Sequence, residues 1–192
     1  MSEDIDYEKF YNLESYLFKD VTEFFQLNGY ISGVQFYCIL IWKAERAKFK
    51  NARKIIKKEE SKSFDENVKT LTHEIHGAKS DLDRIKILFA WDFWIATASA
   101  ILTVLYPERF TIYDFRVVEH EELKRFKNLD SEKSERNAER YLEFIEAVKA
   151  LKLEKEFKDL RSKDRYLWGH SRYNSIVRDI ESGFPLKNKK EI

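Results

Sequence analysis

Asp114 is the residue for which this sequence offers the clearest chemical role. It follows Thr111–Tyr113, precedes Phe115–Val117 and lies beyond an apolar run that ends at Pro107. A carboxylate fixed at such a point can stabilise a developing positive charge, or orient and deprotonate a water molecule. The position also suits a helix N-cap, because a short carboxylate accepts the free N–H groups of a first turn. Three roles stay open for Asp114: a cap only, a catalytic group, or a non-catalytic contact with DNA.

A second group of residues is basic and follows the apolar run Val34–Trp42. If one helix extends from Gly33 to Lys58, six cations lie within about one quadrant of its surface. They are Lys43, Arg46, Lys50, Arg53, Lys54 and Lys57. Such a stripe can contact a phosphate backbone, or it can be a solvated face that acids elsewhere in the fold balance. The net charge of the chain is only +1, so overall charge favours neither nucleic acid nor a membrane.

Aromatic residues form the third group. They are Trp91, Phe93, Trp94 and Trp168, the first three surrounding a single carboxylate, Asp92. They are candidates for packing on a base or a sugar. The alternative is that they fill the junction between two core helices. His73 and His76 are three residues apart, but no partner motif accompanies them, so we expect neither a metal nor another cofactor.

The elements that must position these residues are predicted to be helices. The chain has 192 residues, of which 43% are hydrophobic and 36% charged, with only 5 Gly and 2 Pro. This composition predicts an all-α fold, with residues 1–192 forming one domain or two small lobes around a helix at 94–106. The single cysteine, Cys38, cannot form an internal disulfide, which agrees with a reducing cytoplasm.

Individual elements follow from caps and breakers. Trp94–Tyr106 is apolar on all sides, so it should be a buried helix that stops before Pro107. Residues 114–126 are predicted to form the next helix, with Asp114 at its start. Residues 135–151 carry an amphipathic pattern, and 153–160 should continue as a shorter helix. Gly169 is expected to interrupt the last helix. A membrane span at Ile87–Tyr106 is disfavoured because Asp92 lies within it.

Part of the chain resembles a known enzyme family. Thr97–Leu102, a proline-centred turn and the run Tyr113-Asp114-Phe115-Arg116-Val117 look like the core of the helix-hairpin-helix DNA glycosylases. The similarity is nearest to their 8-oxoguanine-glycosylase-like branch and covers residues of about 84–120 and 159–168. It implies that Thr97-Ala98 matches the family's Thr-Ala pair and that Asp114 matches its catalytic aspartate.

Two departures from the family pattern change the expected chemistry. Ala96 stands at the position of the Schiff-base lysine, and Asp92 and Trp94 stand at the positions of the two hairpin glycines. The resemblance therefore implies a hydrolytic N-glycosylase with DNA as partner and Asp114 as the catalytic residue, without a strand-cutting step. The alternative is a glycosylase-like fold that has lost its chemistry and binds nucleic acid or another protein.

Overall fold

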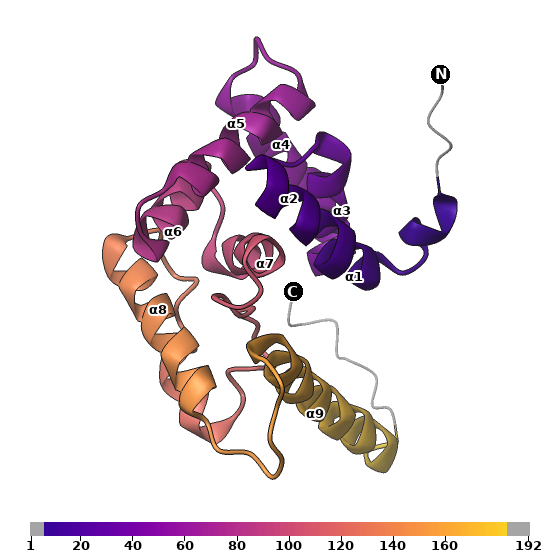
Figure 1. The fold of residues 1–192 in the computed structure, drawn as a ribbon. Helices are drawn as coiled ribbons and strands as arrows, with labels where there is room; N and C mark the ends of the chain where they lie inside the picture. Colours follow the sequence, from indigo (N-terminus) through magenta and orange to yellow (C-terminus); the bar gives the residue numbers. More distant parts are fainter. Residues whose placement is uncertain (1–5, 184–192) are drawn as a thin grey trace.

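The computed structural model describes residues 6–183, and within this range the chain contains helices and no strand (Figure 1). The α-helices are α1 (Leu13–Tyr16), α2 (Thr22–Asn28), α3 (Gly33–Ala44), α4 (Lys48–Lys58), α5 (Phe64–Gly77), α6 (Asp81–Ala90), α7 (Ile95–Leu105), α8 (Glu135–Ala150) and α9 (Leu160–Glu181). Short 3-10 segments occur at Tyr7–Phe10, Glu45–Ala47 and Glu121–Phe126, and a π-helical turn, Leu17–Val21, joins α1 to α2. The predicted all-α class is confirmed.

Helix α7 lies in the middle of the molecule with the other helices around it (Figure 1). Its side chains are buried on nearly every side, and it packs against α2, α3 and α6. Its C-terminal carbonyls are satisfied from α2: Thr22 Oγ1 donates to the Val104 carbonyl at 2.7 Å, and Gln26 Nε2 donates to the Leu105 carbonyl at 2.6 Å. The prediction of a central buried helix that stops before Pro107 is therefore confirmed.

The predicted single helix from Gly33 to Lys58 is wrong. The backbone leaves the helical conformation at Ala44 (φ −161°, ψ 82°), which separates α3 from α4. The two halves bury different residues: α3 inserts Phe36, Ile39 and Leu40 into the core, whereas α4 buries Asn51 and Ile55 against α5. A straight helix cannot serve both contacts, so packing overrides local helix propensity. Lys43 and Arg46 consequently do not share a helix with Lys50–Lys57.

The predicted helix from Asp114 to Phe126 is also wrong. Residues 110–114 have no regular secondary structure, residues 115–119 form turns, and only the 3-10 helix Glu121–Phe126 follows. The Asp114 carboxylate nevertheless caps the turn that follows it, because its Oδ1 accepts from the Arg116 N–H at 3.1 Å. One turn does form at Asp114, whose carbonyl accepts from the N–H groups of Val117 and Val118. Hydrogen bonds of Tyr113, described below, then hold residues 126–129 beside Tyr113, and a continuous helix over 114–126 would carry them away from it.

Two further expectations fail near the C-terminal end. Residues 153–159 are not helical, and α9 continues without interruption through Gly169. A glycine within a helix costs about 1 kcal/mol relative to alanine, which a helix with other contacts tolerates. Asp159 caps α9 by accepting from the Ser162 N–H at 2.6 Å. Within residues 6–183, none of the helices has the length and apolar character needed to cross a bilayer.

Candidate functional site

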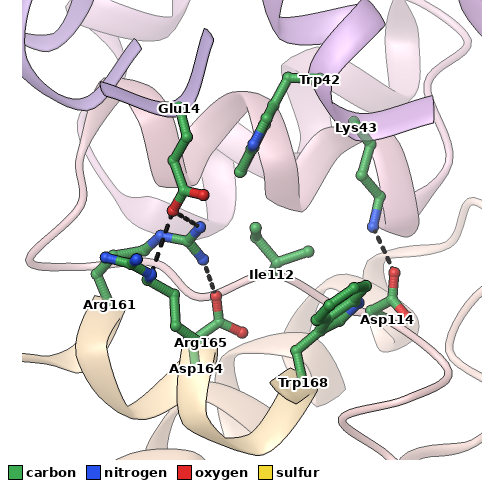
Figure 2. Close-up of a pocket in the computed structure, with 9 residues that line it drawn as sticks. All are labelled: Glu14, Trp42, Lys43, Ile112, Asp114, Arg161, Asp164, Arg165 and Trp168. Atoms are coloured by element: carbon green, nitrogen blue, oxygen red, sulfur yellow. Dashed lines mark hydrogen bonds and ion pairs between the residues drawn. The ribbon is translucent and has the colours of Figure 1, made fainter. Parts of the chain in front are cut away.

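A cavity of about 390 Å³ lies where four separate parts of the chain meet (Figure 2). Glu14 comes from α1, Trp42 and Lys43 come from the last turn of α3, and Ile112 and Asp114 come from the loop after α7. Helix α9 supplies the remaining lining residues, which are Arg161, Asp164, Arg165 and Trp168. The volume lies in the range of pockets that hold small molecules. The cavity therefore brings Asp114 together with Lys43 and Trp168, three of the residues singled out from the sequence.

Asp114 and Lys43 form an ion pair at one side of this cavity (Figure 2). Lys43 Nζ lies 3.0 Å from Asp114 Oδ2, and both side chains are largely buried. The break at Ala44 makes this contact possible, because it ends α3 one residue after Lys43. One carboxylate oxygen thus faces an ammonium and the other accepts from the Arg116 N–H. The arrangement fixes the orientation of the carboxylate within the cavity wall.

Helix α7 holds the backbone of Asp114 in place through the preceding residue. The Tyr113 N–H donates to Ser99 Oγ of α7 at 3.0 Å. The Tyr113 hydroxyl donates to the carbonyl of Phe126 or Lys127, both at 2.8 Å, and accepts from the Leu129 N–H. Tyr113 is buried, and burial raises the pKa of its hydroxyl, which keeps the group protonated as a donor. A small polar residue in an otherwise apolar helix therefore anchors the loop that carries Asp114.

Two tryptophans from different helices, with Ile112 between them, give the cavity its apolar surface (Figure 2). Phe18 packs edge-on against Trp42 with ring centroids 5.3 Å apart, and the Arg161 guanidinium lies 5.3 Å from the Trp42 ring. The Arg116 guanidinium lies 5.6 Å from the Trp168 ring. Trp168 remains 43% exposed, so a ligand can reach its ring from solvent.

The opposite side of the cavity holds a chain of charges (Figure 2). Arg161 pairs with Asp164 on its own helix and donates to Glu14 Oε1 of α1 at 2.7 Å. Arg165 reaches the same Glu14 oxygen at 3.3 Å. Burial raises the pKa of Asp164 to about 6, although the positive charges of Arg161 and Lys43 oppose the shift. The network fastens α9 to α1 and places a carboxyl that titrates near neutral pH in the wall of the cavity.

The other predicted aromatic residues do not line this cavity. Trp91 is buried, and its indole N–H donates to Glu74 Oε2 at 2.8 Å. Phe93 is fully buried against Phe36 of α3. Trp94 is half-buried at the start of α7, with the Lys133 ammonium 5.0 Å from its ring. Of the four candidates, only Trp168 contributes to the cavity, while Trp91 and Phe93 fill the junction between helices.

The predicted cations divide between two places. Lys43 belongs to the cavity described above, and Arg46 is exposed on the 3-10 segment. The remaining four line a separate depression of about 450 Å³ together with Lys58 and Ala90–Asp92; they are Lys50, Arg53, Lys54 and Lys57. Two lysines of this depression donate to main-chain oxygens: Lys54 Nζ to the Asp92 carbonyl at 2.8 Å, and Lys58 Nζ to the Ala90 carbonyl at 3.0 Å. Burial, with Lys133 and Lys50 nearby, lowers the pKa of Lys54.

The turn between α6 and α7 has an unusual backbone. Asp92 has φ +65°, the left-handed region that glycine adopts most readily and aspartate tolerates. Its carboxylate pairs with Lys133. The first free N–H groups of α7 follow directly, and the N–H of Ala96 donates to Asp130 Oδ1 at 3.1 Å. A carboxylate of the same chain thus sits where a helix N-terminus would attract an anion.

Sequence reasoning missed Trp42, Glu14, Arg161 and Asp164 as members of the site. Trp42 ends an apolar run and therefore looked like a core residue, although it directly precedes Lys43. The charged residues of α9 offered one signal, the i, i+3 pair Arg161 and Asp164, but such pairs are common on exposed helices. In residues 6–183, histidine, cysteine and carboxylate side chains do not gather in a group of three that could hold a metal ion. Comparison of the chain with protein-family models, curated proteins and solved structures finds no match.

Proposed function

We propose that this protein is a hydrolytic DNA N-glycosylase that receives an extruded nucleotide in the cavity between Trp42 and Trp168. The observation that carries the proposal is the position of Asp114, whose carboxylate is fixed in the wall of an aromatic-lined cavity by Lys43. A base must leave the DNA stack before an enzyme can reach its glycosidic bond, and aromatic side chains stabilise the unstacked base. The cavity supplies both the aromatic surface and the carboxylate.

The chemistry follows from the charge of the reacting sugar. As the bond between C1′ and the base nitrogen breaks, the electron pair leaves with the base and the sugar gains positive charge. The Asp114 carboxylate stabilises that charge and orients the water that attacks C1′, taking up its proton. Lys43 holds the carboxylate in a fixed orientation through their ion pair. Ala96 provides no amine, and Lys43 is committed to its ion pair, so the product is an abasic site without strand cleavage.

The turn between α6 and α7 supports the proposal independently. The family that the sequence resembles has a glycine at the position of Asp92, and Asp92 adopts the φ of +65° that glycine favours. The order of elements also agrees with the resemblance: a helix, a tight turn, a buried helix, a proline and then the aspartate. One residue of this turn therefore has the backbone conformation that glycine favours, although the glycine itself is absent.

The test is base release from duplex oligonucleotides that carry 8-oxoguanine, uracil or alkylated bases, with alkali added to reveal abasic sites. Wild type is compared with Asp114→Asn, which preserves the shape of the side chain but removes its charge. We expect the variant to lose release by at least about a hundredfold, the usual effect of removing a group that stabilises transition-state charge. Binding to the same oligonucleotides should be unchanged within a few-fold.

Asp20→Asn is a matched control, because Asp20 also pairs with a lysine, Lys9 at 3.2 Å, but lies outside the cavity. It should release bases at the wild-type rate. Equal rates for wild type and Asp114→Asn would refute the catalytic role of Asp114. Absence of release by wild type across the panel would refute the glycosylase proposal for these bases.

A second candidate is a module that binds nucleic acid or another protein without chemistry, and the contact between Asp130 and the Ala96 N–H favours it. In the family that the sequence resembles, the hairpin and the start of the next helix approach a DNA phosphate, whereas here a carboxylate fills the helix terminus. Salt-sensitive binding without base release would select this candidate. Asp130→Asn should then strengthen DNA binding, because it removes a negative charge from the helix terminus.

A further inference from the structure

Helix α9 buries one side and leaves the other uncovered. Its buried residues are Leu160, Asp164, Leu167 and Ser171, which recur at helical spacing along one side. The opposite side spans about 140° of arc at 100° per residue. We call its part between Arg165 and Ile176 the α9 face; it consists of Arg165, Trp168, Gly169, Arg172, Tyr173 and Ile176, and Asp179 follows on the same side about one turn later. Tyr173 is 66% exposed and Ile176 45%, so large apolar side chains remain in solvent there.

The charge of this segment is one-sided. From Arg165 to Arg178 the sequence contains three arginines and neither aspartate nor glutamate. In the whole chain acidic and basic residues nearly balance, because 36% of the residues are charged and the net charge is only +1. On the α9 face, Arg172 and Arg165 flank the aromatic residues, and Arg165 remains largely exposed although its Nε also lies 3.3 Å from Glu14 Oε1. Arg116 adds a further cation beside Trp168 and is held there by a hydrogen bond of its Nη1 to Ser175 Oγ at 3.1 Å. The surface is therefore suited to a polyanion.

Gly169 has no role that the fold explains. A Cβ at this position would meet no atom within 4 Å, and the residue has ordinary helical backbone in the middle of α9. Glycine there lowers helix stability without any packing benefit. Glycine leaves the helix backbone without a side chain at this point, and Arg165, Arg172 and Tyr173 are its neighbours one turn away on the helix surface. Glycine is also used where a ligand approaches the backbone closely, and this reason can apply to Gly169.

The α9 face is continuous with the cavity, because Arg165 and Trp168 belong to both. We propose that the α9 face binds a single strand of nucleic acid, whose bases stack on Trp168 and Tyr173 while its phosphates contact Arg165 and Arg172. The proposal rests on the function proposed above and adds the form of the partner: the strand that runs on from the nucleotide in the cavity is unpaired.

A single strand fits this surface better than a duplex. In a duplex the faces of the bases are covered by their neighbours, so exposed aromatic side chains would find only the sugar–phosphate backbone. Alternating aromatic and cationic side chains are the arrangement with which proteins bind unpaired strands without regard to sequence. The depression lined by Lys50, Arg53, Lys54, Lys57 and Lys58, which we call the α4 depression, is less suited. Its aromatic residue, Trp91, is buried, and Lys54 and Lys58 donate to main-chain oxygens.

The test is fluorescence anisotropy with a labelled 15-nucleotide oligothymidylate and with the matching unmodified duplex, neither of which contains a damaged base. Arg172→Gln and Tyr173→Ala each should weaken binding to the single strand about tenfold. Arg172→Gln should also reduce the slope of log affinity against log salt by about 0.7, the value for one phosphate contact in a single strand. Lys50→Gln combined with Arg53→Gln serves as the control and should leave single-strand binding unchanged.

Gly169→Ala separates a binding role from a structural one. The added methyl group should raise Tm by about 2–4 °C, because alanine is the better helix former. It should also weaken binding to the oligothymidylate, because the methyl group covers helix backbone that the strand would approach. A variant that is more stable and binds less tightly cannot be explained by damage to the fold.

Several outcomes would overturn the inference. Binding of wild type to the duplex but not to the single strand would overturn it. Wild-type affinity for the single strand in Arg172→Gln and Tyr173→Ala, together with weaker binding by the Lys50→Gln, Arg53→Gln control, would also overturn it. Asp114→Asn should bind the single strand like wild type. If no base is released from the duplex panel but the α9 variants bind the single strand less tightly, the glycosylase proposal fails and the α9 face stands as a strand-binding surface.

Discussion

The α4 depression and the cavity that Lys43, Asp114 and Trp168 line are built from the same kinds of residue, but these residues make different contacts in the two places. Each combines lysine with tryptophan beside the end of a helix. At α4, Lys54 and Lys58 donate to the last carbonyls of the α6 end and its turn, and the Lys58 ammonium lies 5.5 Å from the buried Trp91 ring. In the cavity, Lys43 meets the carboxylate of Asp114 instead, and Trp168 is open to solvent.

The difference shows why residue type alone does not identify a site. A lysine that satisfies main-chain carbonyls replaces a helix C-cap and contributes to stability. A lysine that pairs with a carboxylate beside an open cavity orients a group that can act on a ligand. The first arrangement holds an ammonium against main-chain carbonyls, whereas the second holds a carboxylate in the wall of an open cavity. The two regions should therefore respond in opposite ways to substitution, one through stability and the other through activity.

The largest expected difference is between two tryptophans. Trp91→Ala should lower the free energy of unfolding by about 3–5 kcal/mol, because it removes a buried side chain and leaves Glu74 without its indole partner. Trp168→Ala should cost less than about 1 kcal/mol, since much of its ring is already in solvent. Urea unfolding followed by circular dichroism measures both. Equal losses would mean that the cavity is part of the core.

The second prediction concerns the buried carboxyl of the cavity. The pKa of Asp164 is raised to about 6, so between pH 4 and pH 6 the folded protein binds more protons at this group than the unfolded chain does. Its contribution to stability is present at low pH and is lost as the pH rises through 6. The loss amounts to about 2 kcal/mol between pH 4 and pH 7. Asp164→Asn should remove this part of the pH dependence.

The measurement is the unfolding free energy at several values of pH for wild type and Asp164→Asn. Asp179→Asn is the control, because Asp179 is an exposed carboxylate on the same helix. The curve of the control should run parallel to that of wild type. A curve for Asp164→Asn that also runs parallel would mean that burial does not hold a proton on Asp164.

The elements around these two regions also show which features of the fold could be predicted from the sequence and which could not. The buried helix α7 and its end before Pro107 follow from composition and from proline chemistry, which act locally. The break at Ala44 has no local signal, because alanine is the best helix former and neither glycine nor proline is nearby. It arises from packing on both sides of the break. That break decides that Lys43 joins Asp114 and that the other cations of the predicted stripe do not.

The same reason explains the partners of Asp114. Its importance could be inferred from its place after the proline turn, but Trp42 and Lys43 lie about 70 positions earlier and reach it only through the tertiary fold. The predicted helix at 114–126 fails because Tyr113 binds Ser99 and the carbonyls near residue 126. Hydrogen bonds between distant residues leave no periodic trace in a sequence.

The third prediction tests the ion pair. Lys43→Ala should reduce base release by about ten- to a hundredfold, because Asp114 loses the cation that orients it. Lys43→Arg should recover most of the rate, since a guanidinium can also pair with the carboxylate. The readout is the single-turnover rate of base release, compared with binding of the same oligonucleotide. A loss in binding alone, at an unchanged rate, would make Lys43 a DNA contact rather than a positioning residue.

The smallest expected effect lies on the α4 side. Lys58→Gln should lower the free energy of unfolding by about 0.3–1 kcal/mol, because α6 loses a cation at its C-terminal carbonyls. Base release should stay at the wild-type rate. Lys57→Gln is the matched control: Lys57 is exposed and has no hydrogen bond or ion pair within residues 6–183, so its stability should not change. If Lys58→Gln instead left stability unchanged and impaired base release, the α4 depression would take part in the reaction, and the contrast between the two regions would be lost.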